Sequence, residues 1–210
     1  MEKEAEPAHG LGRAQRRASR TRKRLLDAAL AMFSEKGVEA TAIEDITERA
    51  DVGKGTFYRH FGNKEAVVTA LIESAVDRLI DRIRSASKPP QNLEEVIEQL
   101  LDAHCGFYTE KNDEFLMLFQ GRQLVRLQQA AGELEPPYVP YLQAIEQRLS
   151  AFMPQPADPF KVRRVACALA GFAFVLASLA KPAAAAGEIE KDVQPLRRTF
   201  VSGLVAFLGR

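Results

Sequence analysis

The fold is decided by residues 41–65, which have the sequence TAIEDITERADVGKGTFYRHFGNKE. Apolar residues recur every three or four positions on both sides of a break at Gly53, which is the spacing of helices with one apolar face. Thr41 and Glu44 have the spacing of a capping box, so the first of these helices is expected to begin there. The stretch therefore predicts two short helices joined by a tight turn at Gly53.

The second of these helices is expected to have a buried side and a free side. Phe57 and Phe61 are four residues apart, so both can pack against the preceding helices. Gly55, near the start of the helix, lets the backbone approach a phosphate or a base edge. This arrangement is typical of a helix-turn-helix, whose second helix enters the major groove of DNA. The side chains left to point outward are Lys54, Thr56, Tyr58 and Arg59.

Residues 20–66 resemble the DNA-binding domain of the TetR family of bacterial regulators. The residues that follow the family pattern are Thr41, Ile43, Ile46, Ala50, Gly55, Tyr58, Phe61, Lys64 and Glu65. Gly53 departs from that pattern, because Ser or Thr is common at this position. A glycine lacks the side-chain cap that those residues offer to a helix, and it offers a phosphate no hydroxyl.

The resemblance implies DNA contacts at individual positions. It implies that phosphates are held by Thr41, Tyr58, His60 and Lys64. It implies that base edges are faced by Lys54, Thr56 and Arg59, beside Gly55. Phosphate contacts position a protein on DNA, and base contacts specify the sequence. A double-stranded DNA operator is therefore the expected partner.

Basic residues are concentrated near the N-terminal end. Residues 13–24 hold seven basic side chains and no acidic one, although the net charge of the chain is only +1. Clustered Lys and Arg are expected where a protein contacts phosphates. We expect residues 1–18 to form a flexible basic tail. For residues 1–12 alone, a solvated tail without a partner explains the composition equally well.

The rest of the chain also predicts helices. Strand-like alternation is absent, and long segments repeat apolar residues at helical spacing, so we expect an all-α chain of about nine helices. The expected organisation is a three-helix helix-turn-helix domain over residues 19–66 and a larger helical ligand-sensing and dimerisation domain over residues 67–210. The first helix is expected over residues 19–36, with Gly37 ending it.

Composition points to a cytoplasmic protein. Residues 165–180 carry no charge, but the segment is shorter than the ~20 residues that span a bilayer, so it predicts a buried helix. The start of the chain lacks the apolar stretch of a signal peptide. Cys105 and Cys167 lie in apolar helical segments, as is typical of small core residues in a reducing compartment.

The resemblance implies a homodimer, because the last two long helices of the family usually pair with those of a second copy. The first of them has a ridge of small residues that permits close helix packing, and the second has an apolar face. The expected interface residues are Ala166, Ala170, Ala173, Ala177, Leu196, Phe200, Leu204 and Phe207. The alternative is that both helices are internal to one subunit.

A pocket for a small, largely apolar effector is expected within the larger domain. The residues expected to line it are His104, Phe107, Tyr108, Phe115, Phe119, Gln120, Tyr141 and Phe172. The alternative is that these residues form the core, because aromatic side chains at helical spacing usually pack against one another. For His104 the alternative is a hydrogen-bonded core histidine.

Taken together, these features predict a transcriptional regulator, a repressor released from a palindromic operator by a small-molecule effector. An enzyme built on a helical body and a membrane-associated protein are the alternatives. Against an enzyme, His9, His60 and His104 lack metal-ligand spacing, and neither a Gly-x-Ser-x-Gly motif nor a phosphate-binding loop occurs. We therefore expect no catalytic residue, no metal and no cofactor.

Overall fold

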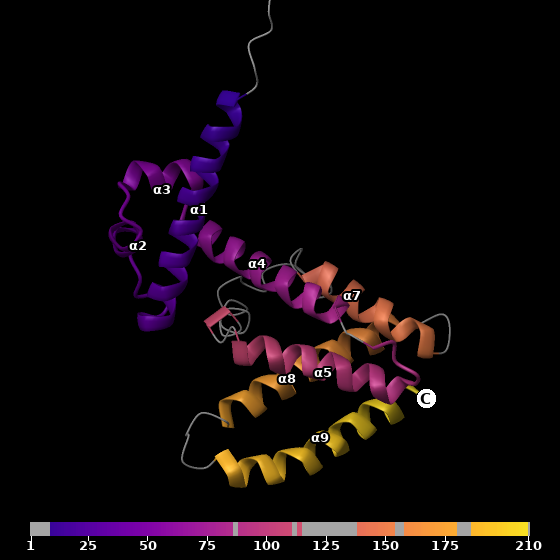
Figure 1. Cartoon of the computed structure of the whole chain (residues 1–210). Coiled ribbons are helices and arrows are strands. Elements are labelled where there is room, and N and C mark those ends of the chain that lie inside the picture. Colours follow the sequence, from indigo (N-terminus) through magenta and orange to yellow (C-terminus); the bar gives the residue numbers. More distant parts are fainter. Residues whose placement is uncertain are drawn as a thin grey trace, which may run out of the picture. The chain divides into compact units, whose positions relative to one another are not determined.

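A computed structural model describes residues 9–85, 88–110, 113–114, 138–153, 158–179 and 186–209 (Figure 1). Every regular element in these ranges is helical, which confirms the all-α class. The elements are α1 (His9–Lys36), α2 (Ile43–Arg49), α3 (Lys54–His60), α4 (Lys64–Arg84), α5 (Leu93–Glu110), α7 (Val139–Leu149), the 3-10 turn η2 (Ser150–Phe152), α8 (Pro159–Leu179) and α9 (Ala186–Leu208).

The chain divides into two compact units, Met1–Leu71 and Ile72–Arg210, with the division inside α4. In the first unit α1 packs against α2, and α2 packs against α3. The main buried side chains of this unit are Leu25, Ala29, Phe33, Ile46, Ala50, Phe57 and Phe61. The predicted helix-turn-helix is therefore present.

Helix α1 begins at His9, well before the predicted start at residue 19. Residues 13–18, which were expected to lie in a flexible tail, are helical. The physical reason is local: these residues are Arg, Ala and Gln, which favour helix, and no proline interrupts them. The end agrees with the prediction, since Gly37 has a φ of 81° and closes the helix in the left-handed conformation.

The predicted capping box at Thr41 is wrong. Helix α2 begins one residue later than expected, and Asp45 accepts a hydrogen bond from the backbone N–H of Ala42 at 2.7 Å. The Thr41 hydroxyl instead donates to the carbonyl oxygen of Gly37 at 2.7 Å. Asp45, the third residue of α2, therefore has the capping role that the sequence pattern predicted for Glu44.

The turn between α2 and α3 depends on Asp51 rather than on Gly53. Asp51 has a φ of 50°, in the left-handed region that Asp tolerates better than most residues. Gly53 has a φ of −76° and serves as the N-cap of α3 without a side-chain hydrogen bond. The Arg24 guanidinium donates to the carbonyl oxygens of Ala50 and Asp51 and pairs with the Asp51 carboxylate. Arg24 therefore holds this turn against α1.

In the second unit α5 is the central helix and packs against α7, α8 and α9. Its buried residues include Val96, Ile97, Leu100, Leu101 and Phe107. Arg82 of α4 pairs with Glu110 at the end of α5, and Arg78 of α4 pairs with Glu114 beyond that helix, each at 2.7 Å. Gly106 permits the first pair, because a Cβ there would lie 2.1 Å from the Arg82 guanidinium.

No helix among the described residues is long and apolar enough to cross a membrane. Helix α8, which contains most of the uncharged segment, instead buries Val162, Val165, Leu169 and Ala173 against its neighbours.

Candidate nucleic-acid interface

Helix α3 has the two faces that the sequence predicts. Phe57 is fully buried, and its ring lies 5.9 Å from that of Phe61. Tyr58 points the other way and is 56% exposed, with its ring edge-on to Phe57 at 5.5 Å. Lys54 and Arg59 are exposed as well, whereas Thr56 and His60 are half-buried. The core thus anchors α3 on one side and leaves the other side free for a partner.

Arg59 and Thr56, both expected to face bases, are hydrogen-bonded to each other. The Arg59 guanidinium donates a hydrogen bond to the Thr56 hydroxyl at 3.0 Å. Because both residues lie on the exposed side of a helix one turn apart, this bond orients the guanidinium along the surface of α3. An Arg held in this way can donate two parallel hydrogen bonds to a guanine edge.

Lys54 is paired with an acidic residue of α2. Its ammonium contacts the Glu44 carboxylate, and both side chains are about half exposed. The hydrogen bond from Lys54 lowers the pKa of Glu44, and the same bond raises the pKa of Lys54. A DNA acceptor must therefore compete with Glu44 for this lysine.

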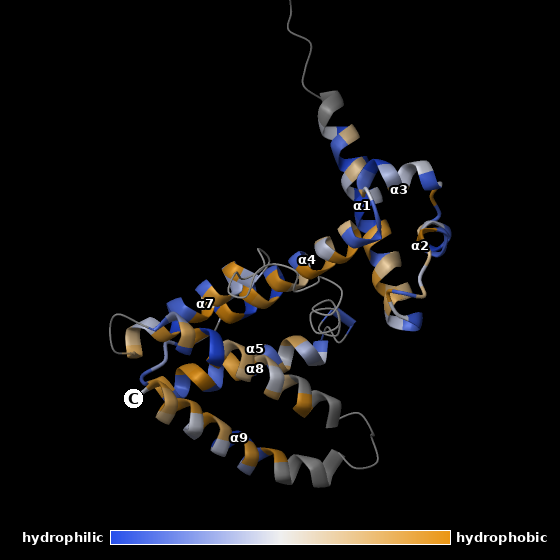
Figure 2. Ribbon diagram, turned by 180° about the vertical axis from the view of Figure 1, so that it is seen from behind, coloured by the Kyte–Doolittle hydropathy of each residue, from blue (hydrophilic) through white to orange (hydrophobic). Residues whose placement is uncertain are grey.

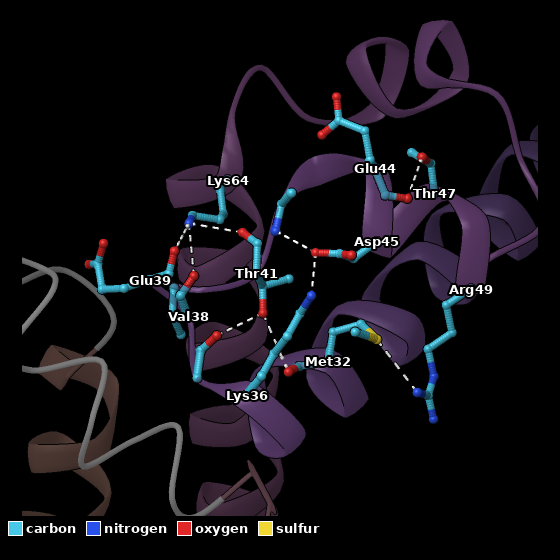
Figure 3. A network of polar contacts seen from close by, with 12 residues as sticks. Met32, Lys36, Val38, Glu39, Thr41, Glu44, Asp45, Thr47, Arg49 and Lys64 are labelled. Atoms are coloured by element: carbon cyan, nitrogen blue, oxygen red, sulfur yellow. Dashed lines mark hydrogen bonds and ion pairs between the residues drawn. The ribbon is translucent and has the colours of Figure 1, made fainter.

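Thr41 and Lys64, both expected to hold phosphates, are used inside the first unit (Figure 3). Thr41 is only 1% exposed, and its hydroxyl is bonded to Gly37. The Lys64 ammonium donates to three carbonyl oxygens, those of Val38 at 2.7 Å, Thr41 at 3.0 Å and Glu39 at 3.3 Å. All three of its N–H groups are thereby occupied. Lys64 thus ties the start of α4 to the turn between α1 and α2.

Packing of the interior does not require a glycine at position 53 or 55. A Cβ at Gly53 or Gly55 would meet no heavy atom within 4 Å. The space beside Gly55 is therefore open, as expected for a position where the backbone approaches a partner rather than a neighbouring helix.

The expected effector pocket is only partly within the described residues, since Phe115, Phe119 and Gln120 lie outside them. His104, Phe107, Tyr108 and Tyr141 are buried, and Phe172 is half-buried. His104 has partners on both ring nitrogens, the carbonyl oxygen of Leu100 at 2.6 Å and the hydroxyl of Tyr141 at 2.7 Å. Burial lowers the pKa of His104 to about 4, and the bond to Leu100 opposes this shift. His104 therefore has the contacts of a neutral core histidine.

The residues expected at a dimer interface separate into two groups. Ala166 and Ala173 are buried within the chain and Ala170 is half-buried, so the small-residue ridge of α8 packs inside the second unit. The side chain of Ala177 lies outside the described residues. On α9, Leu196 is 48% exposed, whereas Phe200, Leu204 and Phe207 are half-buried. Phe200 stacks on Phe172 at 4.0 Å, which joins α9 to α8.

Two further apolar residues of α8, which were not among the predicted interface residues, are exposed. Phe160 and Val175 are 67% and 48% exposed. They lie on the side of α8 opposite its buried residues Val162, Leu169 and Ala173, with Gly171 between them. Their helical spacing contained this signal, but it was visible only once the buried side of α8 was known.

Comparison with known proteins connects the first unit to one family. Residues 25–71 match the family model for bacterial regulatory proteins of the tetR family. The chain is 46% identical over 69 residues to the HTH-type transcriptional repressor KstR of Rhodococcus jostii, which covers 33% of this chain and 31% of that protein. It is 27% identical over 123 residues to the HTH-type transcriptional regulator YvdT of Bacillus subtilis, covering 58% of this chain and 63% of that protein. These matches thus span less than two thirds of either relative.

The likeness in fold extends further. The fatty acid degradation regulator FadR of Bacillus halodurans aligns with a TM-score of 0.62 and 20% identity, covering 87% of this chain and 93% of that chain. A regulatory protein of the tetR family from Rhodococcus RHA1 aligns with a TM-score of 0.63 and 15% identity, covering 90% and 97%. At these identities the comparison establishes the fold alone.

The buried anchor of Phe57 and Phe61 and the outward face of α3 define a helix-turn-helix protein. The match over residues 25–71 then places the chain more narrowly. Over these residues it carries the DNA-binding domain of bacterial regulatory proteins of the tetR family.

Proposed function

We propose that this chain is a DNA-binding transcriptional repressor that occupies a palindromic operator and is released from it by a small-molecule effector. The observation that supports this most directly is the outward face of α3, where Tyr58, Arg59 and Lys54 are exposed while Phe57 anchors the helix. A helix of seven residues can read only a few base pairs, so specific binding requires two copies about one DNA turn, or a multiple of it, apart.

The second copy is supplied by a homodimer formed through α8 and α9. Leu196, Phe160 and Val175 are large apolar side chains that the subunit leaves exposed on these two helices, and the last two long helices of the family usually pair with those of a second copy. The proposed interface therefore contains the α9 residues that the sequence predicted. On α8 it contains the exposed side of the helix, because the ridge of Ala166 and Ala173 is buried within the subunit.

The effector is expected to bind within the second unit, as in a family whose members respond to ligands. The buried aromatic residues Phe107 and Tyr108 favour a largely apolar molecule. An effector can weaken DNA binding only through its different affinities for the two states of the protein, typically by 1–3 kcal/mol, or about 5- to 150-fold.

Sequencing of genomic fragments retained by the purified protein will give the operator. Arg59→Ala should then weaken operator binding by roughly 1–3 kcal/mol and relax the preference at one base pair in each half-site. Glu39→Ala is the control, because its exposed side chain lies outside α3. A uniform loss of affinity with the preference unchanged would make Arg59 a phosphate contact.

Retention of fragments without a shared palindrome would contradict operator recognition itself. Raised transcription of the target genes on deletion distinguishes a repressor from an activator.

A further inference from the structure

Four arginines form a basic stripe on α1 that lies outside the helix-turn-helix core. Arg13, Arg16, Arg17 and Arg20 are spaced by three, one and three residues, so they share one face of the helix. All four are exposed, and none has an ion-pair or hydrogen-bond partner among the described residues. Figure 2 shows this end of α1 as mostly hydrophilic.

The other two arginines of the same segment have structural roles. The Arg22 guanidinium lies 4.9 Å from the centre of the Phe61 ring, just after α3. Arg24 holds the turn just before α3 through Ala50 and Asp51. The four arginines of the basic stripe have no such role in the fold of the first unit.

The contacts of Arg24 show where the stripe lies relative to α3. Arg20 and Arg17 precede Arg24 by four and seven residues, so they follow it on the same face of α1. Arg24 contacts the turn from which α3 begins, and the N-terminal residues of a recognition helix are those that contact base edges. The stripe therefore lies on the same face of α1 as the contact between Arg24 and the turn that precedes α3.

We propose that the basic stripe binds the phosphate backbone of duplex DNA flanking each operator half-site. This inference rests on the proposed function and extends it beyond the helix-turn-helix. Arg13 and Arg20 are separated by about 10 Å along the helix axis, a distance over which one DNA strand presents about three phosphates. The far side of this segment has Ala14, Gln15 and Ala18, which lack the large apolar side chains with which a helix enters a membrane surface.

The test compares two variants of equal charge. Arg16→Gln with Arg17→Gln removes two charges from the stripe and keeps good helix formers in place. Arg84→Gln with Lys88→Gln removes two exposed charges elsewhere. For each protein, affinity is measured against salt on an operator duplex with long flanks and on one trimmed to the palindrome. The stripe variant should lower the log–log salt slope by about 1.8 per subunit on the long duplex only, at about 0.9 per phosphate contact. The control variant should match the wild type on both.

Equal slopes for the stripe variant and the wild type on the long duplex would overturn the proposal, as would an equal reduction on both duplexes. Phosphates carry no sequence information, so the same measurement on a long duplex of unrelated sequence separates the two levels of inference. If the stripe variant lowers the slope there while the wild type shows no operator preference, the stripe is supported and the proposed operator recognition fails.

Discussion

The ammonium of Lys64 lies among three carbonyl oxygens of residues 38–41, more than twenty positions earlier in the chain. A cation near a helix N-terminus opposes the helix dipole, so its placement at the start of α4 needs a compensating interaction. The three carbonyls supply it, since they are backbone groups of a turn that would otherwise depend on water. We therefore expect Lys64 to position this turn rather than to contact a phosphate.

Lys64→Met tests this role, because methionine keeps an apolar stem and removes the ammonium. We expect the free energy of unfolding to fall by about 1.5–3 kcal/mol, the range for hydrogen bonds to a charged group. The salt slope of DNA binding should stay unchanged. Lys23→Met, at an exposed position of α1, serves as the control in thermal unfolding. A smaller slope with unaltered stability would instead make Lys64 a phosphate ligand.

Helices α5, α7 and α8 meet at a buried polar network. The carbonyl oxygen of Leu100 can only accept, so His104 presents N–H at Nδ1 to it, and Nε2 faces the hydroxyl of Tyr141. Tyr141 also lies 3.3 Å from the carbonyl oxygen of Ala166 on α8. The network satisfies polar groups that would be costly to bury alone, and it fixes the register of three helices relative to one another.

The pKa of His104 predicts a specific response to acid. Burial lowers the pKa to about 4 from its ordinary value of 6.5. Between these pH values the unfolded chain binds a proton that the folded chain does not, so stability from this group is complete above pH 6.5 and is lost as the pH falls toward 4. The loss is about 3 kcal/mol, at about 1.4 kcal/mol per pH unit.

His104→Leu should remove this part of the acid sensitivity, measured as the difference from wild type in denaturant unfolding at several pH values. Tyr141→Phe, which keeps the imidazole, should retain it. A wild type and a His104→Leu variant that lose stability in parallel would contradict the assignment. The leucine variant should also keep its response to the effector, because His104 already has two partners in the core.

Dimerisation concerns the whole molecule. Leu196 is the most exposed of the α9 residues predicted at the interface, so Leu196→Asp would bury a charge in an apolar contact without disturbing the subunit core. We expect light scattering to find monomers with intact helicity and much weaker operator binding. Gln194→Asp, on a different side of α9, is the matched control. Dimers that persist in Leu196→Asp would place the interface elsewhere.

Local patterns were sufficient for the helical class, the helix-turn-helix and the two faces of α3. The pairing of Phe57 with Phe61 and the stop at Gly37 are set by spacing and by backbone preference within a few residues. The same local preference extends α1 to His9, although the positive charge of this segment had suggested a flexible tail. Sequence by itself thus determined which elements form and which side of α3 is free.

The partners of polar and small residues were decided by the tertiary structure. The bonds of Lys64 to Val38 and of His104 to Tyr141 join groups 26 and 37 positions apart, and helical spacing carries no information about such distant neighbours. The ridge of Ala166 and Ala173 is compatible with either an internal or an intermolecular contact, and only the rotation of α8 against α5 selects the first. Periodicity defines the faces of a helix, but packing of the whole unit decides which neighbour each face meets.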